Sequence, residues 1–138
     1  MKLNFSRLRY VCLYVADVET SMRFYRDILG LVVESQAPGF VQLGTGTVKL
    51  ALEPGGTGIH GVKDRGRNPY LLQFEAASYE ELSEMTDHLQ SCKVGLLSKL
   101  KATDYGIITA FIDPDGNKLE LLYKGRHGSN VPPSALDG

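Results

Sequence analysis

The order of apolar segments occurs twice along the chain, and this repeat is the feature that most constrains the fold. Residues 8–53 and residues 70–124 each predict a strand, a helix and then three short strands. The two series lie about 60 residues apart and agree in order rather than in identity. Because each repeat has one helix and one small sheet, we expect the helix to cover one sheet face and leave the other free to line a shared cleft. The chain is therefore predicted to be an α+β protein of two βαβββ modules.

The first repeat has a strand with two unlike faces, followed by a capped helix. Alternation along residues 8–15 places Tyr10, Cys12 and Tyr14, which carry polar atoms, on one face, and purely aliphatic side chains on the other. Asp17 follows with the side chain that a helix N-cap needs, and Gly30 is suited to end the helix. The aliphatic face is therefore predicted to pack against this helix.

The second repeat has its own start signal for a helix. Ser78 and Glu81 form the S-x-x-E pattern of a capping box. The apolar side chains that follow at helical spacing, and that predict the buried stripe, are Leu82, Met85, Leu89 and Cys92. Cys92 is accordingly predicted to be a small core residue. Asp-Pro-Asp-Gly at residues 113–116 predicts a tight turn between the last two strands.

Glycine, proline and charge dominate residues 54–69, which indicates a connector between the repeats. A GxGxxG match lies inside it, but the residues that follow cannot form the helix that a dinucleotide fingerprint requires. Residues 125–138 show no period, and we expect them to be a mobile tail. The whole chain, residues 1–138, is therefore predicted to be a single domain made of the two repeats.

The charge and cysteine content exclude several classes of protein. A net charge of −1 excludes a basic nucleic-acid coat protein and a polybasic membrane-surface protein. No apolar run approaches the roughly 20 residues that span a bilayer. The two cysteines lie far apart without CxxC spacing, which favours reduced thiols over a disulfide. We expect a cytoplasmic protein with a small-molecule partner and neither a nucleic-acid nor a membrane partner.

Two stretches of the sequence resemble the vicinal oxygen chelate superfamily, which includes glyoxalase I, bleomycin and fosfomycin resistance proteins and extradiol dioxygenases. They are LYVADVETS at residues 13–21 with FYRDILGL at 24–31, and FIDPDGNKLEL at 111–121. The resemblance covers residues 8–124 and implies the glyoxalase/bleomycin resistance/dioxygenase fold, a cupped mixed sheet around a cleft, and a homodimer. These motifs indicate a fold rather than a reaction, because the superfamily has several chemistries.

In its metal-dependent members, the resemblance implies four His, Gln or Glu ligands on the first and last strands of each repeat. The corresponding positions here, with the alternatives that a shifted register allows, are Tyr10, Ala51 or Lys49, Leu71 or Gln73, and Glu120. Only Glu120 matches a family ligand position, and Ala and Leu cannot bind a metal. The histidines lie in glycine-rich segments or on the predicted outer side of a helix. We therefore expect no cofactor; the alternative is a divalent metal bound by Gln73, Glu120, Glu53 and Tyr10.

Strand alternation and the resemblance together predict that five side chains point to the concave side: Tyr10, Cys12, Tyr14, Gln73 and Glu120. An ordinary core that contains polar atoms would show the same pattern. Aromatic walls with a few polar groups are, however, typical of small-molecule sites, and we interpret the five as ligand-binding residues. Cys12 has no basic group beside it in the sequence, which favours packing over a nucleophilic role. No catalytic residue is identified.

Three functions therefore remain open, and it is open whether the protein is an enzyme. The first is binding of a small organic molecule in the cleft, with the metal site lost. The second is a metal-dependent lyase, isomerase or dioxygenase with a non-standard ligand set. The third is an interaction protein that uses only the fold. A co-purifying metal that is lost in Glu120→Ala would favour the second, and failure to bind any of a broad panel of small molecules would favour the third.

Overall fold

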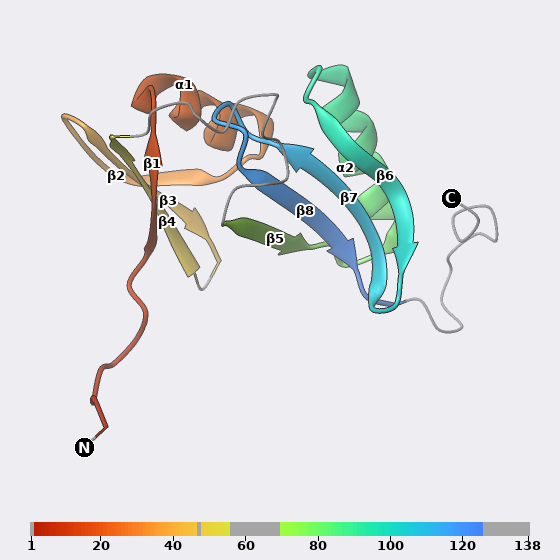
Figure 1. Cartoon of the computed structure of the whole chain (residues 1–138), viewed down its shortest axis with the longest axis horizontal. Helices are drawn as coiled ribbons and strands as arrows, with labels where there is room; N and C mark the ends of the chain where they lie inside the picture. Colours follow the sequence, from red (N-terminus) through yellow and green to blue (C-terminus); the bar gives the residue numbers. More distant parts are fainter. Residues whose placement is uncertain (1, 47, 56–69, 126–138) are drawn as a thin grey trace. The chain divides into compact units, whose positions relative to one another are not determined.

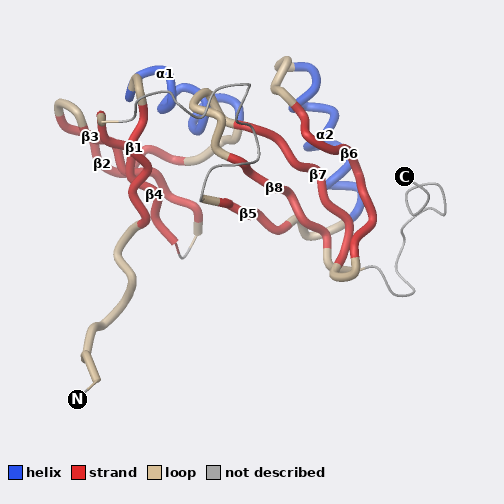
Figure 2. The backbone as a smooth tube through the Cα atoms, viewed as in Figure 1, coloured by secondary structure: helices blue, strands red, loops and turns tan. Residues whose placement is uncertain are grey.

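The computed structural model describes residues 2–46, 48–55 and 70–125 (Figure 1). The chain divides into two compact units, Met1–Ile59 and His60–Gly138. Each unit contains one four-stranded sheet, and Figure 2 shows strands and helices in both. The predicted connector, apart from residues 54 and 55, and the predicted tail, apart from residue 125, lie outside the described residues. That the two units make up a single domain stays a prediction.

The first unit has the predicted order of one strand, a helical segment and three strands. Its elements are β1 (Val11–Val15), α1 (Val18–Arg23), the π-helical segment η1 (Phe24–Ile28), β2 (Val32–Ala37), β3 (Phe40–Thr45) and β4 (Val48–Pro54). The strand order in the sheet is β1-β4-β3-β2. β1 runs parallel to β4, and the other two pairs are antiparallel. The first strand of the repeat therefore lies beside the last.

The second unit repeats this topology. Its elements are β5 (Leu71–Glu75), α2 (Tyr79–Ser91), β6 (Leu96–Thr103), β7 (Gly106–Ile112) and β8 (Lys118–Tyr123). The strand order is β5-β8-β7-β6, and β5 runs parallel to β8. The prediction of two βαβββ modules with mixed sheets is therefore confirmed.

Both helices begin where the sequence predicts. The carboxylate of Asp17 accepts a hydrogen bond from the Thr20 amide at 3.1 Å, and the Ser78 hydroxyl accepts one from the Glu81 amide at 3.1 Å. The Glu81 carboxylate accepts from the amide of Ala77 at 3.3 Å, one residue before the N-cap, so the capping box closes one residue early. In the part of the chain that the structure describes, no helix is long and apolar enough to cross a membrane.

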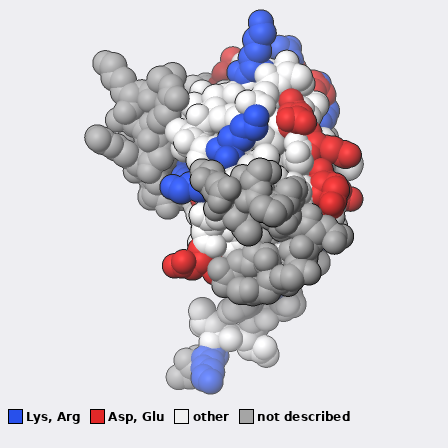
Figure 3. All heavy atoms as spheres, turned by 90° about the vertical axis from the view of Figure 1, so that its right-hand side faces the viewer, with Lys and Arg blue, Asp and Glu red and all other residues white. Residues whose placement is uncertain are grey.

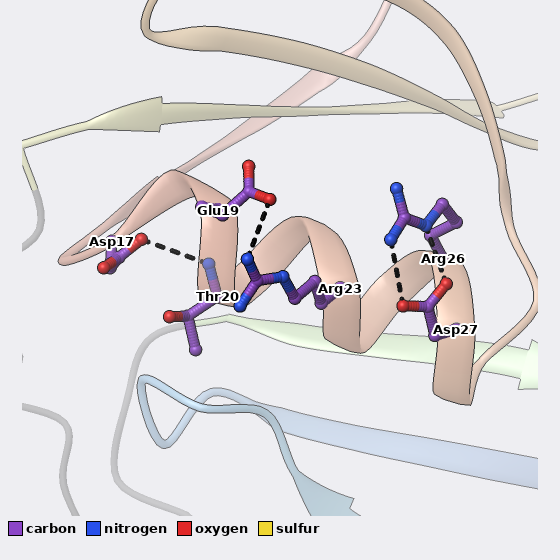
Figure 4. A network of polar contacts seen from close by, with 6 residues as sticks. All are labelled: Asp17, Glu19, Thr20, Arg23, Arg26 and Asp27. Carbon is purple, nitrogen blue, oxygen red and sulfur yellow. Dashed lines mark hydrogen bonds and ion pairs between the residues drawn. The ribbon is translucent and has the colours of Figure 1, made fainter.

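The outer faces of the helices carry charge. Figure 4 shows the first helical segment, where Arg23 lies 3.2 Å from Glu19, and the Arg26 guanidinium makes two contacts with the Asp27 carboxylate. α2 exposes a row of acidic side chains: Glu80, Glu81, Glu84 and Asp87. Figure 3 shows acidic side chains gathered along one side of the surface, with basic ones scattered elsewhere. The exposed ion pairs of the first helical segment contribute little to stability. The exposed charges mark the solvated side of each helix.

The core of the first unit lies between the sheet and the helix. α1 packs on β3 and β4. The buried side chains include Leu13, Val15, Met22, Tyr25, Val41, Leu43, Leu50 and Leu52. Leu13 and Val15 are the aliphatic face of the first strand, and both are almost completely buried. The prediction that this face packs against the helix is therefore consistent with the burial pattern.

A chain of buried hydroxyl groups joins α2 to the second sheet. Thr86 on α2 donates its proton to the Leu82 carbonyl at 2.8 Å, so the Thr109 hydroxyl on β7 must donate to Thr86, 2.8 Å away. Thr109 in turn accepts from the amide of Leu100 at 3.1 Å. Leu100 has a φ of 47°, a left-handed conformation at an irregular point of β6. One polar chain therefore ties the helix to the sheet and stabilises the irregular strand.

The prediction that Cys92 is a core residue is wrong. Cys92 is the C-cap of α2 and is exposed, with its sulfur 3.8 Å from Nε2 of His88. The buried stripe of α2 consists of Leu82, Thr86 and Leu89. The helix ends at Ser91, so a residue beyond it no longer follows the helical period. Thr86 was missed because a hydroxyl is polar by type and becomes a core group only when the sheet supplies its partner.

Replacing Thr86 with Val should lower the free energy of unfolding by about 1–3 kcal/mol, because the buried Thr109 hydroxyl would lose its acceptor. Urea denaturation of the variant and the wild-type protein measures the difference. Thr86→Ser is the control, since it keeps the hydroxyl and should cost about 0.8 kcal/mol for the lost methyl group. A Thr86→Val protein as stable as the wild type would contradict the proposed hydroxyl chain.

Candidate functional site

The face of the second sheet that does not pack on α2 carries a buried carboxylate. Thr109, which bonds α2, marks the helix-facing side of β7, so its neighbour Ala110 lies on the opposite side. Ala110 is paired directly with Glu120 on β8, which therefore also lies on the helix-free face. Glu120 is only 3% exposed. Its carboxylate is thus held within the protein rather than in solvent.

Both oxygens of this carboxylate have partners. Gln73 on β5 stands opposite Glu120 in the parallel register and donates from Nε2 to Oε1 at 2.9 Å. The Lys118 ammonium lies 3.5 Å from Oε2. We call these three residues, Gln73, Lys118 and Glu120, the Glu120 cluster. The predicted site residues Gln73 and Glu120 are therefore brought together, and Lys118 is a member that the sequence did not point to.

The members of the Glu120 cluster differ in their access to solvent. Gln73 is exposed, and the side chain of Lys118 is 35% exposed, whereas that of Glu120 is 4% exposed. Leu71, two residues before Gln73 and on the same face of β5, is 50% exposed. A molecule that approaches this face would therefore meet an amide, an ammonium group and an apolar side chain before it reached the carboxylate.

In the first unit, Cys12 carries a thiol that is held in its neutral form. Its sulfur donates to Oε2 of Glu53 on β4, 3.5 Å away. Burial, then the hydrogen bond to Glu53, then the charge of Glu53 raise the pKa of the Cys12 thiol from 9.0 to about 11. A thiol with such a pKa has almost no thiolate at neutral pH and is a poor nucleophile. Cys12 can act here as a hydrogen-bond donor.

The two tyrosines of the predicted site also lie in the first unit. Tyr14 is paired with Glu53 across β1 and β4, and 60% of it is exposed. Tyr10 precedes β1 and is half-buried, with its ring edge-on to Phe40 at a centroid distance of 6.1 Å. The Arg9 guanidinium lies 5.2 Å from the centre of the Tyr10 ring. Tyr14 is thus available at the surface, while Tyr10 is engaged within its own unit.

A second polar cluster, which the sequence analysis missed, lies on the sheet of the first unit. Lys49 Nζ is 2.8 Å from Oε2 of Glu34, and Gln42 Nε2 is 3.5 Å from Oε1. The hydrogen bond from Lys49 holds the pKa of the Glu34 carboxyl below its ordinary value. Glu34 sits where the register of β2 shifts, and a Cβ on Gly44 would lie 2.8 Å from Oε2 of Glu34. A strand irregularity and a glycine therefore create this contact, and neither shows in side-chain alternation.

Each of the two repeats has a lysine at the matching position of its sheet. Cys12 lies five residues before the N-cap Asp17, as Gln73 lies five before Ser78. Cys12 is paired with Ala51, and Gln73 is paired with Glu120. Ala51 is thus the counterpart of Glu120, and Lys49, two residues earlier, is the counterpart of Lys118. The carboxylate of the second repeat has no equivalent in the first, whereas the lysine does.

The donors at the positions that the resemblance implies do not fit a divalent cation. Ala51 and Leu71 have no ligand atoms, and the alternative residues Lys49 and Gln73 present an ammonium group and an amide N–H to carboxylates. A divalent ion needs several oxygen or nitrogen lone pairs, and in the second unit only Glu120 and the carbonyl oxygen of Gln73 could offer them at these positions. Within residues 2–46, 48–55 and 70–125, no three His, Cys, Asp or Glu residues gather as a metal site.

Replacing Glu53 with Gln should lower the pKa of Cys12 from about 11, because the negative charge beside the thiol is removed. It should stay above 9.0, since burial, the largest cause, remains. The pH dependence of iodoacetamide alkylation, measured in a Cys92→Ser background by mass spectrometry, reports this pKa. Glu75→Gln, in the other unit, is the matched control. An unchanged or higher midpoint in Glu53→Gln would show that Glu53 does not act on the thiol.

Known proteins share both the fold and part of the sequence. A glyoxalase/bleomycin resistance protein/dioxygenase from Nocardioides superposes with a TM-score of 0.71 at 21% identity, over 95% of this chain and 91% of that one. Lactoylglutathione lyase from Agrobacterium tumefaciens gives 0.68 at 21% identity, over 89% and 97%. The metallothiol transferase FosB of Staphylococcus epidermidis is 25% identical over 131 residues, 86% of this chain and 82% of its own length.

The match to a protein family extends over both repeats. The sequence model of the Glyoxalase/Bleomycin resistance protein/Dioxygenase superfamily matches residues 7–121. Among the described residues, this range includes the elements from β1 to the middle of β8, and with them all members of the Glu120 cluster. The fold inferred from residue patterns and the structural likenesses agree with it. The chain belongs to the Glyoxalase/Bleomycin resistance protein/Dioxygenase superfamily.

Proposed function

We propose that the protein binds a small organic molecule on the helix-free face of the second sheet, at the Glu120 cluster, and does so without a metal. The observation that carries this proposal is a buried carboxylate whose two oxygens are held by Gln73 and Lys118, while Gln73 itself is exposed. A few polar groups that buried partners hold in place, and that a ligand can contact, are typical of small-molecule sites.

The cost of burying Glu120 supports a role beyond packing. Taking a carboxylate out of water costs several kcal/mol unless its partners compensate, and apolar residues of similar volume often stabilise such positions better. The same face has buried apolar residues at Ile108 and Leu122, so apolar side chains can pack on this face and no charged residue is needed there. A charged group retained among them is what a binding surface needs to orient its polar contacts.

The first unit, taken by itself, also carries predicted ligand contacts. Tyr14 offers an exposed aromatic ring, and Cys12 and Tyr10 share the polar side of the first strand. We propose these three residues as ligand contacts on the sheet of the first unit. We also propose that the protein is a homodimer in the cytoplasm. Size-exclusion chromatography with light scattering would test the homodimer.

The competing function is metal-dependent chemistry, which membership of the superfamily and the metallothiol transferase relative favour. A cation that bound Glu120 would lie close to the Lys118 ammonium, 3.5 Å from Oε2, and the like charges would repel each other. The geometry of the Glu120 cluster therefore supports metal-free binding better.

Metal analysis and ligand binding on the same preparation distinguish the two functions. Protein purified with a chelator should still show thermal shifts and ¹⁵N chemical-shift changes in β5 and β8 with members of a panel of small aromatic molecules. Glu120→Ala should weaken this binding at least tenfold, about the effect of losing one oriented polar contact. Glu75→Ala, which removes an exposed carboxylate from the same face of β5, should leave it unchanged.

Other outcomes would contradict the proposal. A stoichiometric Zn, Ni, Mn or Fe ion that is lost in Glu120→Ala would support metal-dependent chemistry instead. Absence of binding to every compound of a broad panel would support an interaction protein. Circular dichroism and urea denaturation of Glu120→Ala show whether the variant still folds, and Glu120→Gln, which keeps the shape of the side chain, serves if it does not.

A further inference from the structure

We propose that Gln73 selects ligands that present a hydrogen-bond donor, a hydroxyl or N–H group beside an apolar body, because Glu120 fixes the orientation of the Gln73 amide. This inference rests on the proposed function and specifies the chemical class of its ligand. Glu120 is then a positioning residue, which acts through Gln73 rather than by touching the ligand.

The orientation of the amide follows from hydrogen-bond chemistry. An ionised carboxylate only accepts, and the Gln73 side chain has one donating end, the NH₂ group, and one accepting end, the carbonyl oxygen. The end that contacts Oε1 of Glu120 at 2.9 Å is therefore the nitrogen. The opposite orientation would place two oxygens against each other beside a negative charge. The Lys118 ammonium, 3.5 Å from Oε2, helps to hold the carboxylate in place.

The carbonyl oxygen of Gln73, which does not contact Glu120, is the end of the amide that a ligand would contact. Gln73 is exposed, whereas Glu120 is buried beneath it. Among the residues that the structure describes, no donor contacts Oε1 of Gln73. A carbonyl oxygen accepts hydrogen bonds and cannot donate, so a partner must bring the proton. Ethers, carboxylates and other groups that only accept would leave it unsatisfied.

The surroundings of Gln73 indicate the rest of the ligand. Leu71 lies two residues away on the same face of β5 and is half exposed. Ala110, opposite Glu120 on β7, has a short side chain. A donor group attached to a ring or an aliphatic body would contact the Gln73 oxygen and the Leu71 side chain together. Phenols, alcohols and primary amides with an apolar body make up the predicted class.

A pair of neutral probes that differ only in the donor tests this selectivity. We would titrate the full chain with 4-methylphenol and with 4-methylanisole, and follow the backbone amides of β5 and β8 and the Gln73 side-chain amide by ¹⁵N NMR. The wild-type protein should bind 4-methylphenol roughly tenfold more tightly, the effect of one neutral hydrogen bond. Since neither probe is charged, Lys118 does not bias the comparison.

Three variants separate positioning from packing. Gln73→Met, which keeps the length of the side chain but removes the amide, should bring the affinity ratio of the two probes close to one. Glu120→Gln should reduce the ratio to less than about threefold, because a neutral amide at 120 accepts either orientation of Gln73. Glu75→Gln, on the same face of β5, should keep the wild-type ratio. A merely structural role of Glu120 would weaken both probes equally and leave their ratio unchanged.

The possible failures point to different conclusions. Equal affinity of the wild-type protein for both probes, with shifts in β5 and β8, would overturn the selectivity of Gln73 and leave the proposed function standing. A wild-type ratio in Glu120→Gln would overturn the positioning role of Glu120. Absence of shifts with either probe would overturn the proposed function and this inference with it.

Discussion

The parallel pairing of the first and last strands of each repeat is the constraint on which the rest of the structure depends. In each module the chain leaves its first strand through a helix, and its last strand returns to lie between the first strand and the preceding one. In the second repeat this places Gln73 next to Glu120, although 47 residues separate them. In the first, it places Cys12 beside Ala51 and within reach of Glu53. The Gln73–Glu120 and Cys12–Glu53 contacts both follow from these two parallel ladders.

The two faces of the second sheet differ in whether the partners of their buried polar groups are themselves buried or exposed. Toward α2, Thr86 and Thr109 satisfy each other and are completely buried, so the polar atoms there serve the core. On the helix-free face, Glu120 is equally buried, but its partners Gln73 and Lys118 extend toward solvent. The hydrogen bonds toward α2 join buried groups only, whereas those on the helix-free face join Glu120 to groups that reach solvent. This difference is why the helix-free face is interpreted as a binding surface.

The repeats have kept their architecture and diverged in their chemistry. Lys49 and Lys118 occupy matching positions, and each holds a carboxylate with help from a glutamine. The carboxylates come from different places, Glu34 from an irregular edge strand and Glu120 from the strand that carries the lysine. Superfamily membership therefore fixes the backbone frame, while the few side chains on each helix-free face decide which chemistry that frame can perform.

Local signals in the sequence determined the modules, the helix starts at Asp17 and Ser78, and which strand positions share a face, because capping and alternation depend only on near neighbours. The tertiary structure decided which distant groups meet: that Gln73 donates to Glu120, that Glu34 reaches Lys49 across Gly44, and that Thr86 rather than Cys92 completes the core of α2. Strand register, strand irregularities and the exact end of a helix arise from pairing between segments far apart in the chain, and no short stretch of sequence contains that information.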